Sequence, residues 1–171
     1  MDGFEKRRAR KQESIRRAAL ELFQVHGFRK VSVAEIARRA GVSQVTIYNY
    51  FGSREALVQD VIKWFIRGLV ERYRAVMESD RPFAEKLEEI VFDKSRIAAQ
   101  FQGELLASYV RGNPDIQAFL DRLTGDELQP LTRRFFEDGI REGYIDPGFS
   151  LETSMLYLDI VRRGFYANPD I

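Results

Sequence analysis

Residues 32–51 read SVAEIARRAGVSQVTIYNYF, and the stretch holds two short helix signals separated by one glycine. Ser32 followed by Glu35 has the spacing of a capping box, which predicts a helix that opens after Ser32. Gly41 ends that helix, because glycine adopts the left-handed backbone that a tight corner needs. Ser43 can cap a second helix of about two turns. Two short helices joined in this way predict a helix-turn-helix.

The second of these helices divides into two faces. Val42, Ile47 and Phe51 are the apolar residues that we expect to hold it from behind. The uncharged side chains left for another surface are Gln44, Val45, Thr46, Tyr48, Asn49 and Tyr50. A helix that enters the major groove of DNA needs this division. The alternative is a solvated face whose tyrosines pack on neighbouring side chains.

Helical periodicity continues on both sides of this stretch. Apolar residues at a spacing of three and four predict a helix over residues 12–27, with a stop at Gly27. A long helix is predicted from Arg54 to about Ser79, a length of roughly 37 Å. Further helices are predicted over 82–101, 103–111, 115–123, 127–142 and 150–166, with breaks at Asn113-Pro114 and Thr124-Gly125. No alternating strand pattern of useful length is present, so the fold class is all-α.

Composition argues against an enzyme and against a membrane protein. The 171 residues include no cysteine and one histidine, His26, which we expect to be an ordinary residue at the end of a helix. The carboxylate pair Glu88-Glu89 is adjacent in sequence, so on a helix its members point away from a common target. We predict no catalytic residue, no metal site, no cofactor and no membrane span.

Charge is distributed unevenly along the chain. Residues 1–60 hold twelve Lys and Arg against seven Asp and Glu, whereas residues 61–171 hold fifteen against nineteen. A basic front part is suited to a polyanion such as DNA. The basic run Lys6–Lys11 has two interpretations, an arm that reaches a neighbouring groove or a disordered tail.

The front part resembles the DNA-binding domain of the tetracycline-repressor (TetR) family of bacterial transcription regulators. The resemblance covers about residues 12–60, a third of the chain, and rests on many positions that agree in register. These positions are Ala34-Glu35-Ile36-Ala37, Ala40-Gly41-Val42-Ser43, Thr46-Ile47-Tyr48-Asn49-Tyr50-Phe51, Ser53, Glu55-Ala56-Leu57, Ala18-Ala19-Leu20-Glu21-Leu22-Phe23 and Gly27-Phe28. Beyond residue 60 the resemblance rests on length and helix order alone.

The resemblance implies roles for single residues. It places Gln44, Val45 and Asn49 at base edges, where an amide can pair with adenine and a valine can touch a thymine methyl. The side chains that it implies on phosphates are Thr46, Tyr48 and Tyr50. Position 50 is often histidine and position 54 often lysine in relatives, but the tyrosine and Arg54 found here can also hold a phosphate. Ser32, at a helix start, is a further phosphate candidate.

The resemblance also implies a homodimer that binds a near-palindromic operator in double-stranded DNA. The last predicted helix carries two apolar stripes, of which one needs a partner outside its own core. Together with the helix over 127–142 it predicts a four-helix interface, for which the alternative is burial inside one monomer. The predicted interface residues are Leu128, Leu131, Phe135, Ile140, Leu156, Tyr157, Ile160 and Gly164.

A pocket for a small, largely apolar effector is predicted between the long helix and this interface. Its candidate lining residues are Trp64, Phe65, Tyr73, Phe92, Phe101 and Tyr109, for which the alternative is an ordinary core. The sequence thus predicts a cytoplasmic regulator, more often a repressor in this family. It would have a DNA-binding domain over residues 1–53 and a ligand-sensing and dimerisation domain over 54–171. The competing interpretations are a helical ligand carrier or protein-interaction module without DNA binding, and a small helical enzyme.

Overall fold

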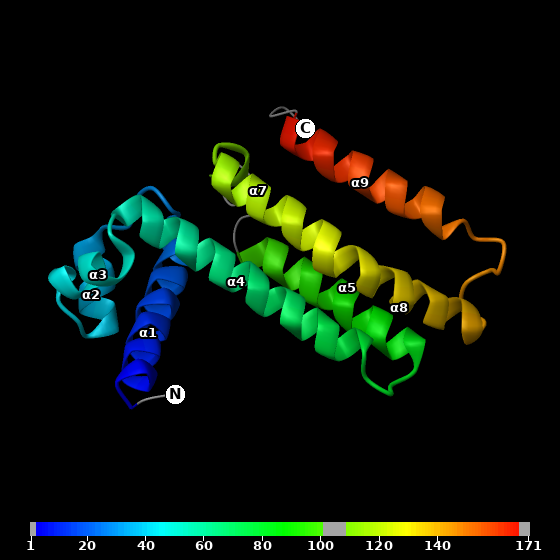
Figure 1. The fold of residues 1–171 in the computed structure, drawn as a ribbon, viewed down its shortest axis with the longest axis horizontal. Coiled ribbons are helices and arrows are strands. Elements are labelled where there is room, and N and C mark those ends of the chain that lie inside the picture. Colours follow the sequence, from blue (N-terminus) through cyan, green and yellow to red (C-terminus); the bar gives the residue numbers. More distant parts are fainter. Residues whose placement is uncertain (1–2, 101–108, 168–171) are drawn as a thin grey trace. The chain divides into compact units, whose positions relative to one another are not determined.

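The computed structural model describes residues 3–100 and 109–167, with the side chains at 94–100, 158 and 161–167 left undescribed. The described part is helical throughout (Figure 1). Its α-helices are α1 Gly3–His26, α2 Val33–Ala40, α3 Gln44–Phe51, α4 Arg54–Met77, α5 Phe83–Gln100, α7 Pro114–Leu123, α8 Gln129–Arg141 and α9 Leu151–Ala167. Two compact units share these helices: unit 1 holds residues 3–67 with residue 100, and unit 2 holds 68–99 and 109–167. Helix α4 contributes to both.

Unit 1 is built on one apolar core. Its fully buried side chains come from four helices and are Ile15, Ala19, Ile36, Ile47, Leu57, Val58, Val61 and Ile62. Burying a side chain of this size stabilises a fold by about 1.5–3 kcal/mol. Arg16 of α1 adds a bidentate ion pair with Asp60 of α4, with N–O distances of 2.6 and 3.1 Å. The core and this pair fix α3 against α1 and α4.

The predicted caps of the helix-turn-helix are present. The Ser32 hydroxyl accepts the Glu35 N–H while the Glu35 carboxylate accepts the Ser32 N–H, so the capping box is confirmed. Gly41 lies in the left-handed region with φ 67°, and Ser43 caps α3 by accepting the Thr46 N–H at 3.1 Å. These contacts position α3 at a sharp angle after α2.

The basic run Lys6–Lys11 is part of α1, so its interpretation as a disordered tail is wrong, whereas its contact with a neighbouring DNA groove stays a prediction. Between Gly3 and Gly27 no glycine or proline interrupts the chain, and Arg, Lys, Ala and Gln favour helix. The helix therefore continues through the whole basic run and ends at His26, as predicted for that residue.

Unit 2 has a core in which α4, α5 and α8 meet. Val76, Phe83, Ile90 and Phe135 are buried there, and the Phe83 and Phe135 rings lie 4.7 Å apart. The Cβ of an alanine at position 139 would lie 2.7 Å from the Phe83 ring, so α8 approaches α5 closely at this glycine.

The predicted break at Thr124-Gly125 is wrong. A π-helical segment, Thr124–Leu128, joins α7 to α8 without a loop. Glycine inside a helix costs about 1 kcal/mol relative to alanine but does not forbid the helix. The buried side chains of Leu123 before the segment and Leu131 after it hold both helices on the core of unit 2.

Residues 3–100 and 109–167 show neither a membrane-spanning helix nor a cluster of metal-ligating side chains. No described helix has both the length and the apolar character that crossing a lipid bilayer requires. Within the same ranges, no three Asp, Glu, His or Cys side chains cluster in a way that could hold a metal ion.

Candidate nucleic-acid interface

Helix α3 presents an uncharged outer face. Ile47 is 1% exposed, and Val42 and Phe51 are half-buried, so these three residues hold the helix as expected. On the other side, Val45 is 66% and Tyr48 46% exposed. Gln44 and Asn49 are exposed as well, while Thr46 and Tyr50 are half-buried. The arrangement follows from the helical repeat, which puts residues 47 and 51 one turn apart on one side.

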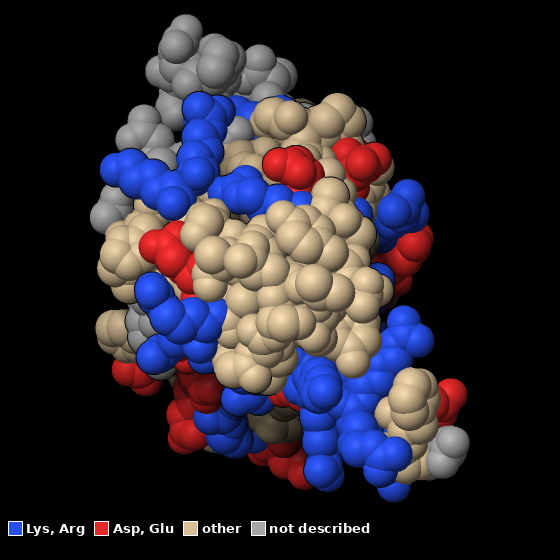
Figure 2. Space-filling view, turned by 90° about the vertical axis from the view of Figure 1, so that its left-hand side faces the viewer, with Lys and Arg blue, Asp and Glu red and all other residues tan. Residues whose placement is uncertain are grey.

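Basic side chains border this face. Figure 2 views the molecule from the side on which α2 and α3 lie in Figure 1, and it shows an uncharged area bordered largely by Lys and Arg side chains, with some Asp and Glu side chains also at its edge. Helix α3 itself carries no charged residue. The exposed basic residues of unit 1 include Arg29, Lys30, Arg38, Arg39 and the basic run of α1. A neutral centre with a cationic border is suited to bases in the centre and phosphates at the border.

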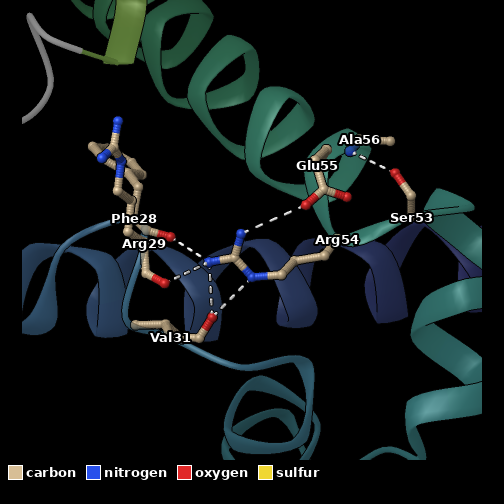
Figure 3. A network of polar contacts seen from close by, with 7 residues as sticks. All are labelled: Phe28, Arg29, Val31, Ser53, Arg54, Glu55 and Ala56. Carbon is tan, nitrogen blue, oxygen red and sulfur yellow. Dashed lines mark hydrogen bonds and ion pairs between the residues drawn. The ribbon is translucent and has the colours of Figure 1, made fainter.

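Arg54 holds the loop between α1 and α2. Its Nε and Nη2 atoms donate to the carbonyl oxygen of Val31 at 3.1 and 3.0 Å, and Nη2 also donates to the carbonyls of Phe28 and Arg29 (Figure 3). Nη1 lies 3.9 Å from the Glu55 carboxylate. The planar guanidinium can serve several acceptors at once, which an ammonium group cannot do. The structure therefore gives Arg54 a positioning role that the sequence did not indicate, since its partners lie 23 to 26 residues upstream.

Ser32 already uses both of its donors. Its hydroxyl donates to the Glu35 carboxylate at 2.7 Å, and its backbone N–H donates to the same oxygen at 2.8 Å. These hydrogen bonds from Ser32, first the side chain and then the backbone, lower the pKa of Glu35. A phosphate at this position would have to compete with the carboxylate for the same two protons.

Tyr50 contacts the basic run of α1. The Arg8 guanidinium lies over the Tyr50 ring, 5.8 Å from its centre, and the Tyr50 and Phe51 rings are nearly perpendicular, at 79°. A guanidinium over an aromatic face is an attractive contact. No pattern in the sequence indicated it, because the helix was predicted to begin only at residue 12.

The residues predicted for an effector pocket are divided between the two units. Trp64 and Phe65 are half-buried in unit 1, whereas Tyr73 packs against the core of unit 2. Phe101 lies outside the described residues. Tyr109 is half-buried in unit 2.

Unit 2 holds an apolar groove that includes one of these residues, Phe92. The groove has a volume of about 570 Å³ and lies between α5 and α8. Leu87, Val91 and Phe92 come from α5, and Phe136 and Phe149 come from α8 and the segment after it. Phe92 is 66% exposed there, so the groove is open to solvent.

The predicted dimer residues are also divided. Leu131 and Phe135 are each 4% exposed within one chain, and Phe135 is part of the core of unit 2, so the assignment of both residues to an interface is corrected. Periodicity marks an apolar stripe but not the surface that covers it. Leu128 and Ile140 are half-buried.

Helix α9 leaves large apolar side chains in solvent. Leu156, Tyr157 and Ile160 are 60%, 65% and 57% exposed. Gly164 lies beyond the residues whose surroundings are described. An apolar stripe of this kind on a helix is typical of a surface that another chain covers.

Comparison with known proteins identifies relatives that are bacterial transcription regulators. Residues 15–61 match the family model for bacterial regulatory proteins of the tetR family. The HTH-type transcriptional repressor KstR2 of Mycobacterium tuberculosis is 24% identical over 144 residues, which cover 81% of this chain and 70% of the relative. The HTH-type transcriptional regulator UidR of Escherichia coli K12 is 29% identical over 149 residues, 85% of this chain and 75% of the relative.

Solved structures agree at the level of the fold. A TetR transcription regulatory protein from Mycobacterium vanbaalenii has a TM-score of 0.71 at 23% identity, covering 95% of this chain and 96% of that one. Thermus thermophilus FadR, a TetR-family transcriptional repressor in complex with lauroyl-CoA, has a TM-score of 0.52 at 28% identity, covering 93% and 83%. The helix-turn-helix, its outward-facing α3 and these relatives lead to one conclusion. They support a DNA-binding transcription regulator of the TetR type rather than an enzyme, with the family match itself confined to residues 15–61.

Proposed function

We propose that this regulator reads its operator through α3, with Gln44, Val45 and Asn49 at base edges. The observation that carries the proposal is the division of α3, in which Ile47 is buried while the two amides are exposed. Glutamine and asparagine can each form two hydrogen bonds with adenine, and a valine methyl fits the methyl group of thymine. We therefore expect A·T pairs to contribute most of the base preference.

Phosphates are the proposed partners of Thr46, Tyr48 and Tyr50. Their hydroxyls can each donate one hydrogen bond, and none of them adds a charge. Ser32 and Arg54 are weaker candidates, because Glu35 and the carbonyls after α1 occupy their donors. In this proposal, residues 1–53 hold the reading head, and residues 54–171 hold the sensing and dimerisation part.

The proposed assembly is a homodimer on a near-palindromic site. Its support is the stripe of Leu156, Tyr157 and Ile160 on α9, which a second copy of the helix would cover. Two copies of α3 would then reach successive major grooves, about 34–36 Å apart. A monomer would lose half of these contacts.

A small, largely apolar molecule is the proposed effector, and the groove between α5 and α8 is its proposed site. The groove volume of about 570 Å³ lies in the range of ligand pockets, and aromatic rings form much of its lining. The relative from Thermus thermophilus, described as in complex with lauroyl-CoA, binds a molecule with an apolar chain. We propose that the regulator is a repressor in the bacterial cytoplasm and that the effector releases it, with a coupling of about 1–3 kcal/mol.

The base-reading proposal can be tested by fluorescence anisotropy. The probes are a labelled duplex from the promoter of the regulator's own gene and a random duplex of equal length. Tyr48→Ala should weaken binding to both duplexes nearly alike, whereas Gln44→Ala and Asn49→Ala should reduce the difference between them. If neither amide substitution changes the ratio of the two affinities, α3 does not read bases. If no duplex is bound, the ligand-carrier alternative is favoured.

A further inference from the structure

The first three turns of α1 hold a cluster of cations for which the described part of the chain shows no acidic partner. Among the described residues, none of the five basic side chains of Lys6–Lys11 takes part in an ion pair, and all are exposed. Later in the same helix, Arg16 pairs with Asp60 and Arg17 pairs with Glu13, both at 2.6 Å. The free charge of α1 is therefore concentrated in its first turns.

Arg8 brings this cluster to the reading helix. Its guanidinium lies 5.8 Å from the centre of the Tyr50 ring, and Tyr50 belongs to α3. The ring occupies one face of the guanidinium, but the N–H donors lie in the plane of the group and can still bind oxygen. Arg8 is thus presented beside the side of α3 that the proposed function places on phosphates.

The shape of the cluster is suited to a polyanion. Because five of the six positions from Lys6 to Lys11 carry a cation, the charges extend over about 7.5 Å along α1 at 1.5 Å per residue. Surface cations without carboxylate partners release counterions when they meet a chain of phosphates. Paired cations such as Arg17 contribute less, because the carboxylate already neutralises them.

We propose that Arg8, stacked on Tyr50, binds the DNA backbone beside the α3 contacts, and that the basic run of α1 is a second phosphate-binding surface. The inference rests on the proposed function of α3 but adds residues outside the helix-turn-helix. The surface recognises phosphate charge and not sequence, so it strengthens binding to every duplex by the same factor.

The test measures the salt dependence of binding. Full-length wild type, Arg8→Gln and the control Arg17→Gln bind a labelled 30-base-pair random duplex at a series of salt concentrations. Removing one phosphate contact should lower the slope of log K against log salt by about 0.9 for Arg8→Gln. The loss of DNA affinity of Arg8→Gln relative to wild type should then be about 3.5-fold smaller at 200 mM salt than at 50 mM salt. Arg17→Gln removes the same formal charge, and its slope should stay near that of wild type.

Two further variants separate charge from stacking. Arg8→Lys keeps the charge and should retain most of the slope. Tyr50→Leu removes the ring that orients Arg8. If the two side chains act together, the double variant Arg8→Gln/Tyr50→Leu should lose less DNA affinity than the product of the fold-losses of the two single variants. A fold-loss of the double variant equal to the product of the two single fold-losses would show that the contact between the two side chains does not matter for binding.

The outcomes also separate this inference from the proposed function. If Arg8→Gln and Arg17→Gln give the same slope while Asn49→Ala still loses base preference, the α1 surface is wrong and the role of α3 stands. If the wild type binds no duplex, both proposals fail. Circular dichroism of each variant confirms that the helices are intact.

Discussion

At the scale of single residues, the helix-turn-helix is held together by polar side chains that the sequence analysis had assigned to DNA contacts. Ser32 was expected on DNA, yet its hydroxyl and N–H both bind Glu35. Arg54 was also expected on DNA, yet most of its donors bind backbone carbonyls between α1 and α2. Such carbonyls would otherwise lose hydrogen bonds on folding. We therefore expect both residues to affect DNA binding first through the shape of the domain.

Arg54→Ala should destabilise unit 1 by about 1.5–3 kcal/mol, because the substitution removes charge-assisted hydrogen bonds to several carbonyls. Arg54→Lys should recover only part of this loss, since one ammonium cannot reach all of the acceptors. Urea unfolding followed by circular dichroism measures the change, with the exposed Lys30→Ala as control. Equal stability of the lysine variant and the wild type would contradict the positioning role.

The Glu35 carboxylate makes the capping box sensitive to acid. Its pKa is lowered in the folded chain by the hydrogen bonds from Ser32, so its contribution to stability is fully present above the unfolded-state pKa. That contribution is lost as the pH falls through the lower, folded-state pKa. The stability difference between wild type and Glu35→Gln, measured by urea unfolding from neutral to acid pH, should therefore shift in favour of the variant as the pH falls. A difference that is independent of pH would show that the carboxylate is not stabilised in this way.

At the scale of helices, the caps and turns could be predicted from the sequence, but the surfaces on which the helices pack could not. The caps at Ser32 and Ser43, the turn at Gly41 and the burial of Ile47 all follow from residues close in sequence. The continuous π-helical join between α7 and α8 was missed, because Thr-Gly is a common break in sequence. Leu131 and Phe135 were placed on the wrong surface, because periodicity shows that a stripe is buried but not by what.

The contact between α5 and α8 depends on the absence of a side chain at Gly139. Gly139→Ala should destabilise unit 2 by about 1–3 kcal/mol, because the new Cβ would lie 2.7 Å from a buried Phe83 ring. Gly68→Ala in α4 is the matched control, since no described atom outside the backbone of its own helix lies within 4 Å of the added Cβ. Alanine there should stabilise the helix by about 0.5–1 kcal/mol. Thermal unfolding measures the two changes in stability, which should have opposite signs. A Gly139→Ala variant that is more stable than wild type would refute the close approach of α8 to α5.

At the scale of the whole molecule, the proposed regulation depends on two copies of the chain that act together. The covered surface that we propose is the apolar stripe of α9, whose three large side chains are more than half exposed in one chain. The sequence indicated this stripe through its second apolar face, although it also assigned to the interface residues of α8 that belong to the core. The groove between α5 and α8 was anticipated only through Phe92.

Ile160→Glu should convert the dimer into monomers, because a charge would be placed in the centre of the proposed apolar interface. Sedimentation velocity at micromolar concentration measures the change, and DNA affinity should fall at least tenfold as one half-site is lost. Ser154→Glu, about 120° around the same helix from Ile160, is the control and should remain a dimer. A dimeric Ile160→Glu would place the interface elsewhere.

The central claim, that two copies of α3 read DNA together, is tested most directly by selecting ligands from a pool of random duplexes with purified wild type and Asn49→Ala. The wild type should enrich an inverted repeat whose half-site centres lie one helical turn of DNA, about 10–10.5 base pairs, or a multiple of it apart. Asn49→Ala should enrich the same repeat with the preference lost at one position in each half. A pool without an inverted repeat, or a motif that the substitution leaves unchanged, would contradict the account.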